Sequence, residues 1–148
     1  ELKRYVGEEG YKNFRKNHTE YYFELILRRN IALYEFSKSL EGDVFYDRGL
    51  HDSEAYYSYF GFEIPEWYLE QYGKRLYDHV FILTTLESFK ERPSSGRLST
   101  KRVSQDLFNE LVEVYRRRGY NPIIVREFSP KKSENVSLRA EFVLNYLL

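Results

Sequence analysis

Apolar residues recur at helical spacing along most of this chain, and three short apolar runs interrupt the helical pattern. The longest helical pattern begins after Asn17, which can cap a helix with Glu20 three residues later, and it runs to Gly42. Its apolar positions are Tyr22, Leu25, Ile26, Leu33, Phe36 and Leu40. This spacing predicts one long amphipathic helix.

Four further helices and three strands are predicted in the same way. The helices cover residues 52–61, 65–76, 103–119 and 136–147, and the strands cover residues 44–46, 79–83 and 122–125. Short apolar strands that alternate with helices are typical of a parallel sheet with helices on both faces, so we expect a three-layer α/β fold. The 148 residues fit a single domain, because no linker or repeat divides them.

Polar pairs follow the three predicted strands. They are Asp47-Arg48, Thr84-Thr85 and Arg126-Glu127. Because right-handed crossovers place the carboxyl ends of parallel strands at one edge of the sheet, we expect these pairs to lie together. Only Asp47-Arg48 suggests chemistry, since the carboxylate can bind Mg²⁺ or accept a proton and the guanidinium can clamp phosphate oxygens. The alternative is a structural pair, or a turn that leads into a helix cap.

The charge composition gives no sign of a nucleic-acid or membrane partner, since the chain has 23 basic and 23 acidic residues. No apolar stretch reaches the ~20 residues that a membrane span needs. The absence of cysteine excludes disulfides, thiol catalysis and cysteine metal sites, and it agrees with a cytoplasmic location. We therefore expect a cytoplasmic protein without a membrane partner.

The phosphate-binding loop Gly-x-x-x-x-Gly-Lys-Ser/Thr does not occur in the sequence. Gly73-Lys74 does not form one, because Arg75 follows it and Tyr68 stands where the first glycine belongs. The chain also contains no methionine and begins at Glu1. We interpret the sequence as a fragment of a nucleotide-binding protein from which the segment with this loop is missing.

Three other groups of residues have weaker functional interpretations. The three histidines lie at unrelated spacings that do not support a zinc site, so we expect surface or helix-cap histidines. The tyrosines can stack on bases or line a nucleoside pocket, although at helical spacing they more often belong to a core. A basic strip consists of Lys101-Arg102, Arg116-Arg117-Arg118 and Lys131-Lys132. Such a strip can bind nucleic acid, but cations in the last turn of a helix also complement the helix dipole.

Several motifs together resemble a known family. They are Asp47 to Tyr57 (Asp-Arg-Gly-Leu-His-Asp-Ser-Glu-Ala-Tyr-Tyr), Phe60-Gly61, Ile64-Pro65-Glu66, Tyr77 to Leu83, Gly96-Arg97 and Val114 to Tyr120. This set resembles the small AAA-domain family of P-loop ATPases and kinases, which includes the ribosylnicotinamide kinase domain and is similar to nucleoside and nucleotide kinases. The resemblance covers nearly the whole chain.

The start of the chain also resembles this family, because Glu1 to Val6 is similar to its Glu-x-x-Arg segment. In the family, a strand, the phosphate-binding loop, a helix and a second strand precede that segment. Roughly thirty to forty residues, the length of a βαβ unit, are therefore missing from this sequence. If the natural protein lacks them, catalysis is in doubt. The alternative is an RNA- or protein-binding module that uses the tyrosine-rich helices and the basic strip.

The resemblance implies roles for five residues of the chain. Asp47 would be a catalytic residue beside Mg²⁺, and Arg48 would contact the phosphate or the acceptor. Glu1 and Arg4 would approach the acceptor substrate, and Asp52 would support the Asp-Arg-Gly turn on the substrate side. These roles predict a site for ATP, Mg²⁺ and a small-molecule acceptor.

The resemblance also implies a lid over residues 86–102. Arg97 matches the arginine of the family's lid, where it would reach the transferring phosphate as a third catalytic residue. The alternative is an ordinary solvated arginine. We therefore expect an ATP- and Mg²⁺-dependent NTPase or phosphotransferase that acts on a small acceptor or on water.

Overall fold

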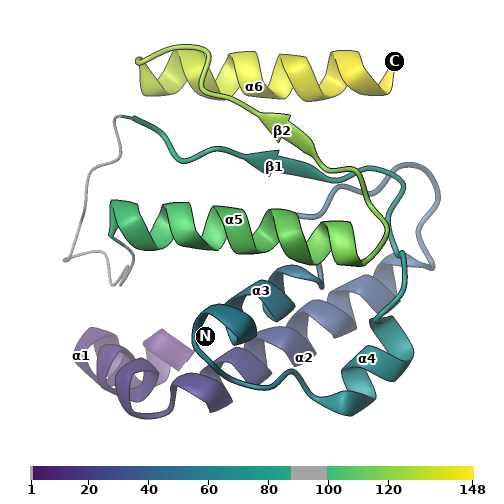
Figure 1. Ribbon diagram of the computed structural model, residues 1–148. Helices are drawn as coiled ribbons and strands as arrows, with labels where there is room; N and C mark the ends of the chain where they lie inside the picture. Colours follow the sequence, from purple (N-terminus) through teal and green to yellow (C-terminus); the bar gives the residue numbers. More distant parts are fainter. Residues whose placement is uncertain (1, 88–99) are drawn as a thin grey trace. The chain divides into compact units, whose positions relative to one another are not determined.

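The structure is a computed structural model that describes residues 2–87 and 100–148 (Figure 1). It divides into two compact units, residues 1–70 and 71–148. In the described ranges, no helix is both long enough and apolar enough to cross a membrane.

The first unit is helical. Its elements are α1 (Leu2–Asn17), α2 (Thr19–Ser37), α3 (Asp52–Tyr59) and the first part of α4 (Glu66–Tyr72). The hydrophobic pattern does not predict α1, which has few apolar residues and a kink at Gly7 with a φ of 69°. Glycine adopts this left-handed value without a steric penalty, so the chain changes direction there.

The predicted helix that follows Asn17 is present as α2, but Asn17 does not cap it. Asn17 is the last residue of α1, and its side-chain amide donates to Asn13 Oδ1 at 3.0 Å. Backbone hydrogen bonds run on across the junction, from His18 N to Phe14 O and from Tyr22 N to His18 O. His18, with a non-helical φ of −133°, is the N-cap of α2, and its backbone makes hydrogen bonds of both helices, so Asn17 is not at a helix start.

The core of the first unit joins α2, α3 and α4. Phe23 and Leu27 of α2, Ala55 and Tyr57 of α3, and Tyr68 of α4 are all buried. The Phe23 ring lies 5.0–6.4 Å from the rings of Tyr56, Tyr57, Phe60 and Phe62. Burial of this aromatic cluster packs α3 against α2, and so fixes the segment that leads into α3.

The predicted strand at residues 44–46 is wrong. In the described part of the chain the only sheet is a pair of strands that does not include these residues. Val44 and Phe45 are 38% and 65% exposed, whereas a strand of a parallel sheet is buried on both faces. The Tyr46 hydroxyl is hydrogen-bonded to Ser37 Oγ, and its ring lies 6.0 Å from that of Tyr34. These contacts hold the apolar run against the end of α2 instead of in a sheet.

The second unit contains a parallel pair of strands with a helix on each side (Figure 1). Its elements are β1 (Phe81–Leu83), α5 (Lys101–Arg117), β2 (Ile123–Val125) and α6 (Lys132–Leu147). Ile82 lies opposite Ile124 in the register of the pair. These two predicted strands, their parallel pairing and the predicted helices at 103–119 and 136–147 are confirmed. The larger three-layer sheet stays a prediction, because the described sheet has two strands.

The core of the second unit packs α5 on the sheet. Val80 and Ile82 lie against Val112 and Tyr115 of α5 and against Tyr120. The helix has the ends that its sequence indicates. The Thr100 hydroxyl accepts a hydrogen bond from Val103 N at the start, and Gly119 follows the last turn with a φ of 80°. This local agreement explains why α5 is predictable.

Candidate functional site

The candidate site is built on the segment Asp47-Arg48-Gly49, here called the DRG segment. Arg48 has a φ of 85°, the one positive value outside glycine in the described chain. An L-residue with a side chain pays roughly 1–2 kcal/mol for left-handed backbone, so other contacts must hold Arg48 in place. Gly49, which would adopt this conformation freely, does not have a positive φ.

The contacts that hold Arg48 come from α3. Its Nη1 donates to the Tyr56 hydroxyl at 3.0 Å and lies 3.7 Å from Asp52 Oδ2. Asp52 is also fixed by its backbone N–H, which donates to Gly49 O at 3.2 Å. Partial burial lowers the pKa of Arg48, but attraction to Tyr56, Asp52 and Asp47 outweighs this, and the net pKa is raised. Arg48 is therefore a fixed cation whose side chain is still 54% exposed.

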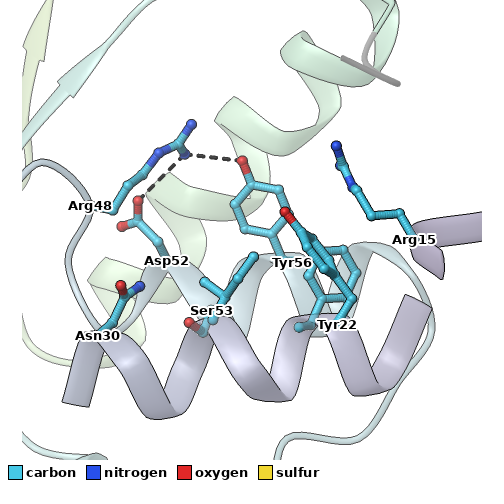
Figure 2. Close-up of a pocket in the computed structure, with 9 residues that line it drawn as sticks. Arg15, Tyr22, Asn30, Arg48, Asp52, Ser53 and Tyr56 are labelled. Carbon is cyan, nitrogen blue, oxygen red and sulfur yellow. Dashed lines mark hydrogen bonds and ion pairs between the residues drawn. The ribbon is translucent and has the colours of Figure 1, made fainter. Parts of the chain in front are cut away.

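An open pocket with a volume of about 240 Å³ lies beside Arg48 (Figure 2). Residues of α1, α2 and α3 and Arg48 itself line it: Arg15, Tyr22, Phe23, Ile26, Asn30, Arg48, Asp52, Ser53 and Tyr56. Figure 2 shows Tyr22 and Tyr56 in the middle, with Arg15 to one side and Arg48, Asp52 and Asn30 to the other. The pocket thus has an apolar part between two polar ends.

At one end of the pocket, Arg15 makes cation–π contacts with two tyrosines. The Arg15 guanidinium lies 4.8 Å from the centre of the Tyr22 ring and 5.6 Å from that of Tyr11. The two tyrosine hydroxyls are hydrogen-bonded to each other at 2.9 Å. Burial and the bond to Tyr11 raise the pKa of Tyr22 to about 12, although Arg15 opposes the shift. Tyr22 is therefore a neutral phenol that can donate and accept hydrogen bonds at ordinary pH.

A buried polar cluster of His51, Glu54 and Tyr68 lies just after the DRG segment in the chain. His51 is fully buried, and its Nδ1 lies 2.8 Å from Glu54 Oε1 and 3.1 Å from the Tyr68 hydroxyl. His51 is not a surface histidine, and although it stands at the N-cap position of α3, its ring makes no capping bond. The residue bonds to Glu54 in the next turn and to Tyr68 of α4. This cluster joins α4 to the residues that follow Arg48.

The structure brings together two of the six predicted site residues, Arg48 and Asp52, as an ion pair at the pocket. Asp47 is exposed beside them and does not line the pocket. Arg4 is an exposed residue of α1 and does not line the pocket either. Glu1 and Arg97, with residues 88–99 of the predicted lid, lie outside the described residues. The roles of all six stay predictions.

Sequence reasoning missed Arg15 and Asn30 as pocket residues, whereas Tyr22 and Tyr56 are among the tyrosines for which a pocket-lining role is the weaker interpretation. Tyr22 and Asn30 follow the helical spacing of Ile26, four residues to either side, so the three share one face of α2. A polar amide on that otherwise apolar face is a signal that could have been recognised. Arg15 had no such signal, because the sequence did not predict α1.

The DRG segment does not follow a strand. The prediction that three polar pairs meet at one edge of a sheet is therefore wrong for Asp47-Arg48. Two of those pairs do meet at the ends of β1 and β2. The buried Arg139 of α6 donates from Nη2 to Thr84 O and from Nε to Arg126 O, both at 2.9 Å. Burial lowers the pKa of Arg139, while Glu127 opposes the shift. Arg139, which sequence reasoning also missed, ties the two strand ends together.

The basic strip is partly matched by acidic side chains of the same helix. Arg116 lies 2.9 Å from Glu113, and Arg102 lies 3.9 Å from Asp106. Such exposed pairs add little stability, but they reduce the positive charge that α5 presents. The geometry of α5 therefore does not favour nucleic-acid binding over an ordinary charged helix surface.

The described residues contain no group of three His, Cys, Asp or Glu side chains that could hold a metal ion. Asp47 supplies one exposed carboxylate. Mg²⁺ in nucleotide sites is commonly held by one or two carboxylates together with phosphate oxygens and water. Asp47 therefore fits a metal ion that arrives with a nucleotide.

A family model described as an AAA domain matches residues 5–131. No curated protein and no solved structure matches the chain. The matched range includes the DRG segment, every residue that lines the pocket, and both strands of the second unit.

Proposed function

Because the chain belongs to the AAA-domain family of P-loop NTPases, we propose that the protein binds ATP with Mg²⁺ and transfers the γ-phosphoryl group. The acceptor is a small molecule in the pocket of the first unit, or water. Membership of the family supports nucleotide binding at a general level. The pocket beside Arg48 favours a small-molecule acceptor.

One observation carries this proposal, the left-handed backbone of Arg48 beside an open pocket. A non-glycine residue in a sparsely populated backbone conformation costs about 1–3 kcal/mol, and such residues cluster at functional sites. Here Tyr56 and Asp52 hold the guanidinium, while about half of the Arg48 side chain stays accessible. A fixed, accessible guanidinium is suited to bidentate contact with phosphoryl oxygens.

Asp47, Asp52 and Arg97 have the remaining roles in the proposed reaction. Asp47 has the chemistry to hold Mg²⁺ or to accept the proton of an attacking hydroxyl. Asp52 orients Arg48 through their ion pair. Mg²⁺ bound with ATP would neutralise part of the phosphate charge. Arg97, from the lid that the family resemblance implies, is the further cation proposed for the transferring phosphate.

The phosphate-binding loop is the missing part of this proposal. It does not occur in the 148 residues, and we propose that a segment preceding Glu1 supplies it. Backbone amides and a lysine of such a loop hold the β- and γ-phosphates, and the described residues offer no equivalent cradle. The described chain thus supplies the acceptor side of the site.

The test compares the protein made from its complete gene with the 148-residue chain. We expect Mg²⁺-dependent consumption of ATP by the complete protein, and loss of that activity when EDTA removes the metal. In calorimetry the 148-residue chain should show no micromolar binding of Mg-ATP, because it lacks the phosphate-binding loop. An inactive complete protein contradicts the proposed enzymatic activity. Micromolar binding of Mg-ATP by the 148-residue chain contradicts the proposal that a further segment must supply the phosphate-binding loop.

A further inference from the structure

We propose that the pocket of the first unit binds a small hydroxylated anion, a phosphate ester or a carboxylate, with its anionic group at Arg15 and a hydroxyl group at the Arg48–Asp52 end. This assignment rests on the proposed function for the direction of the ligand, since the hydroxyl is the group that would receive the phosphoryl. The binding itself does not require ATP.

The Arg15 end is prepared for an anion. The guanidinium lies over the Tyr22 ring and near the Tyr11 ring, so less rotamer freedom is lost when a ligand binds. The Tyr22 phenol is beside it and is neutral, and it can donate a hydrogen bond to the same anion. A guanidinium next to a phenol donor recognises a phosphate or a carboxylate better than a neutral group.

The opposite end is suited to a hydroxyl group. Asp52 is a carboxylate whose side chain is 14% exposed, and Asn30 offers both an amide donor and a carbonyl acceptor. Figure 2 places both of them on the Arg48 side of the two tyrosines. A hydroxyl that donates to Asp52 lies close to Arg48, which is where a phosphoryl oxygen would be bound in the proposed reaction.

The charge and size of the pocket restrict the ligand further. The lining contains two cations, Arg15 and Arg48, and one acid, Asp52, so its formal charge is positive and favours an anion. Pockets for drug-sized ligands have volumes of about 300–1,000 Å³, and this one of about 240 Å³ is smaller. The apolar surface of Phe23, Ile26 and the tyrosines suits a short carbon skeleton between the two polar ends. A sugar phosphate or a sugar acid has these properties.

Calorimetry without ATP tests the assignment on the complete protein with ribose 5-phosphate, gluconate and ribose as probes. We expect ribose 5-phosphate or gluconate to bind and ribose to bind at least about tenfold more weakly, because a charge-assisted contact is lost. Binding by only one of the two anions identifies the ester or the carboxylate as the ligand. No binding of either anion, or equal binding of ribose, overturns the assignment.

Variants of α1 locate the anion. Arg15→Gln should lower the affinity for the anion by about tenfold or more. Lys16→Gln, which removes an exposed cation next to Arg15, should leave the affinity unchanged. Arg15→Lys keeps the charge without the planar stack and should lose less, which guards against a folding defect in Arg15→Gln. Equal effects of Arg15→Gln and Lys16→Gln overturn the assignment. Intact anion binding in a protein that does not consume Mg-ATP contradicts the proposed enzyme alone.

Discussion

Arg48 donates a hydrogen bond to the hydroxyl of Tyr56, eight residues later in the chain, at 3.0 Å. The bond joins a residue with a left-handed backbone to α3, the helix whose buried face packs on α2. Tyr56 also lies 5.7 Å from Phe23 in the aromatic cluster. The position of the guanidinium therefore depends on the core of the first unit.

The backbone strain at Arg48 predicts a difference between two substitutions. Arg48→Gly and Arg48→Ala both remove the contacts to Tyr56 and Asp52, but only alanine keeps a Cβ at a φ of 85°. We expect Arg48→Gly to be the more stable variant by about 1 kcal/mol in urea unfolding. A glycine variant that is no more stable than the alanine variant would show that this backbone position is not strained.

The exposed carboxylate of Asp47 predicts a loss of activity without a loss of stability. In the complete protein, Asp47→Asn should lower turnover of Mg-ATP by ~100-fold or more, the scale for removal of a catalytic base or metal-positioning carboxylate. Asp43→Asn is the matched control, because Asp43 is an exposed acid four residues earlier. Steady-state kinetics and thermal unfolding of both variants provide the comparison. If Asp47→Asn keeps the turnover of Asp43→Asn, Asp47 has a structural role only.

The buried polar cluster behind the DRG segment predicts a large effect on stability. His51→Ala leaves Glu54 and Tyr68 buried without the imidazole, so we expect a loss of about 1–3 kcal/mol in the free energy of unfolding. Tyr68→Phe removes one hydroxyl from the same cluster and should cost about 1 kcal/mol. Urea unfolding measures both.

A matched tyrosine provides the control for this cluster. Tyr59→Phe changes the same atom at the end of α3, away from His51, and should stay within about 0.5 kcal/mol of wild type. If Tyr68→Phe and Tyr59→Phe have equal effects, the Tyr68 hydroxyl does not contribute to the stability of the cluster.

The second unit could be predicted largely from the sequence, because its local signals agree with its packing. The apolar run of β1, the Thr100 cap and Gly119 each indicate the element that forms. The strand predicted at residues 44–46 failed for a physical reason. An apolar run is equally compatible with packing on a helix end, and pairing in a sheet depends on a partner that the run itself does not encode.

The candidate site could be predicted only in part. The pair Asp47-Arg48 indicates a polar site, and the family resemblance implies a supporting role for Asp52. Arg48 and Asp52 do form an ion pair. The left-handed backbone of Arg48 could not be read from the sequence, because Gly49 next to it is the residue expected to adopt that conformation. Arg15 and Tyr22 meet only through the packing of α1 on α2, a tertiary contact that helical periodicity does not specify.

The raised pKa of Tyr22 predicts how stability depends on alkaline pH. The ordinary pKa of 10.0 is raised to about 12, so between these two values the folded protein keeps the phenol proton and the unfolded chain loses it. The unfolded state then binds fewer protons, and the free energy of unfolding contributed by Tyr22 falls as the pH rises from 10 to 12. Below pH 10 both states are protonated, so this contribution is fully present and constant. Urea unfolding across this range should give a shallower decline for Tyr22→Phe than for wild type, whatever stability the variant has at neutral pH. Identical slopes in the two proteins would show that the Tyr22 phenol titrates in the folded protein as it does in the unfolded chain.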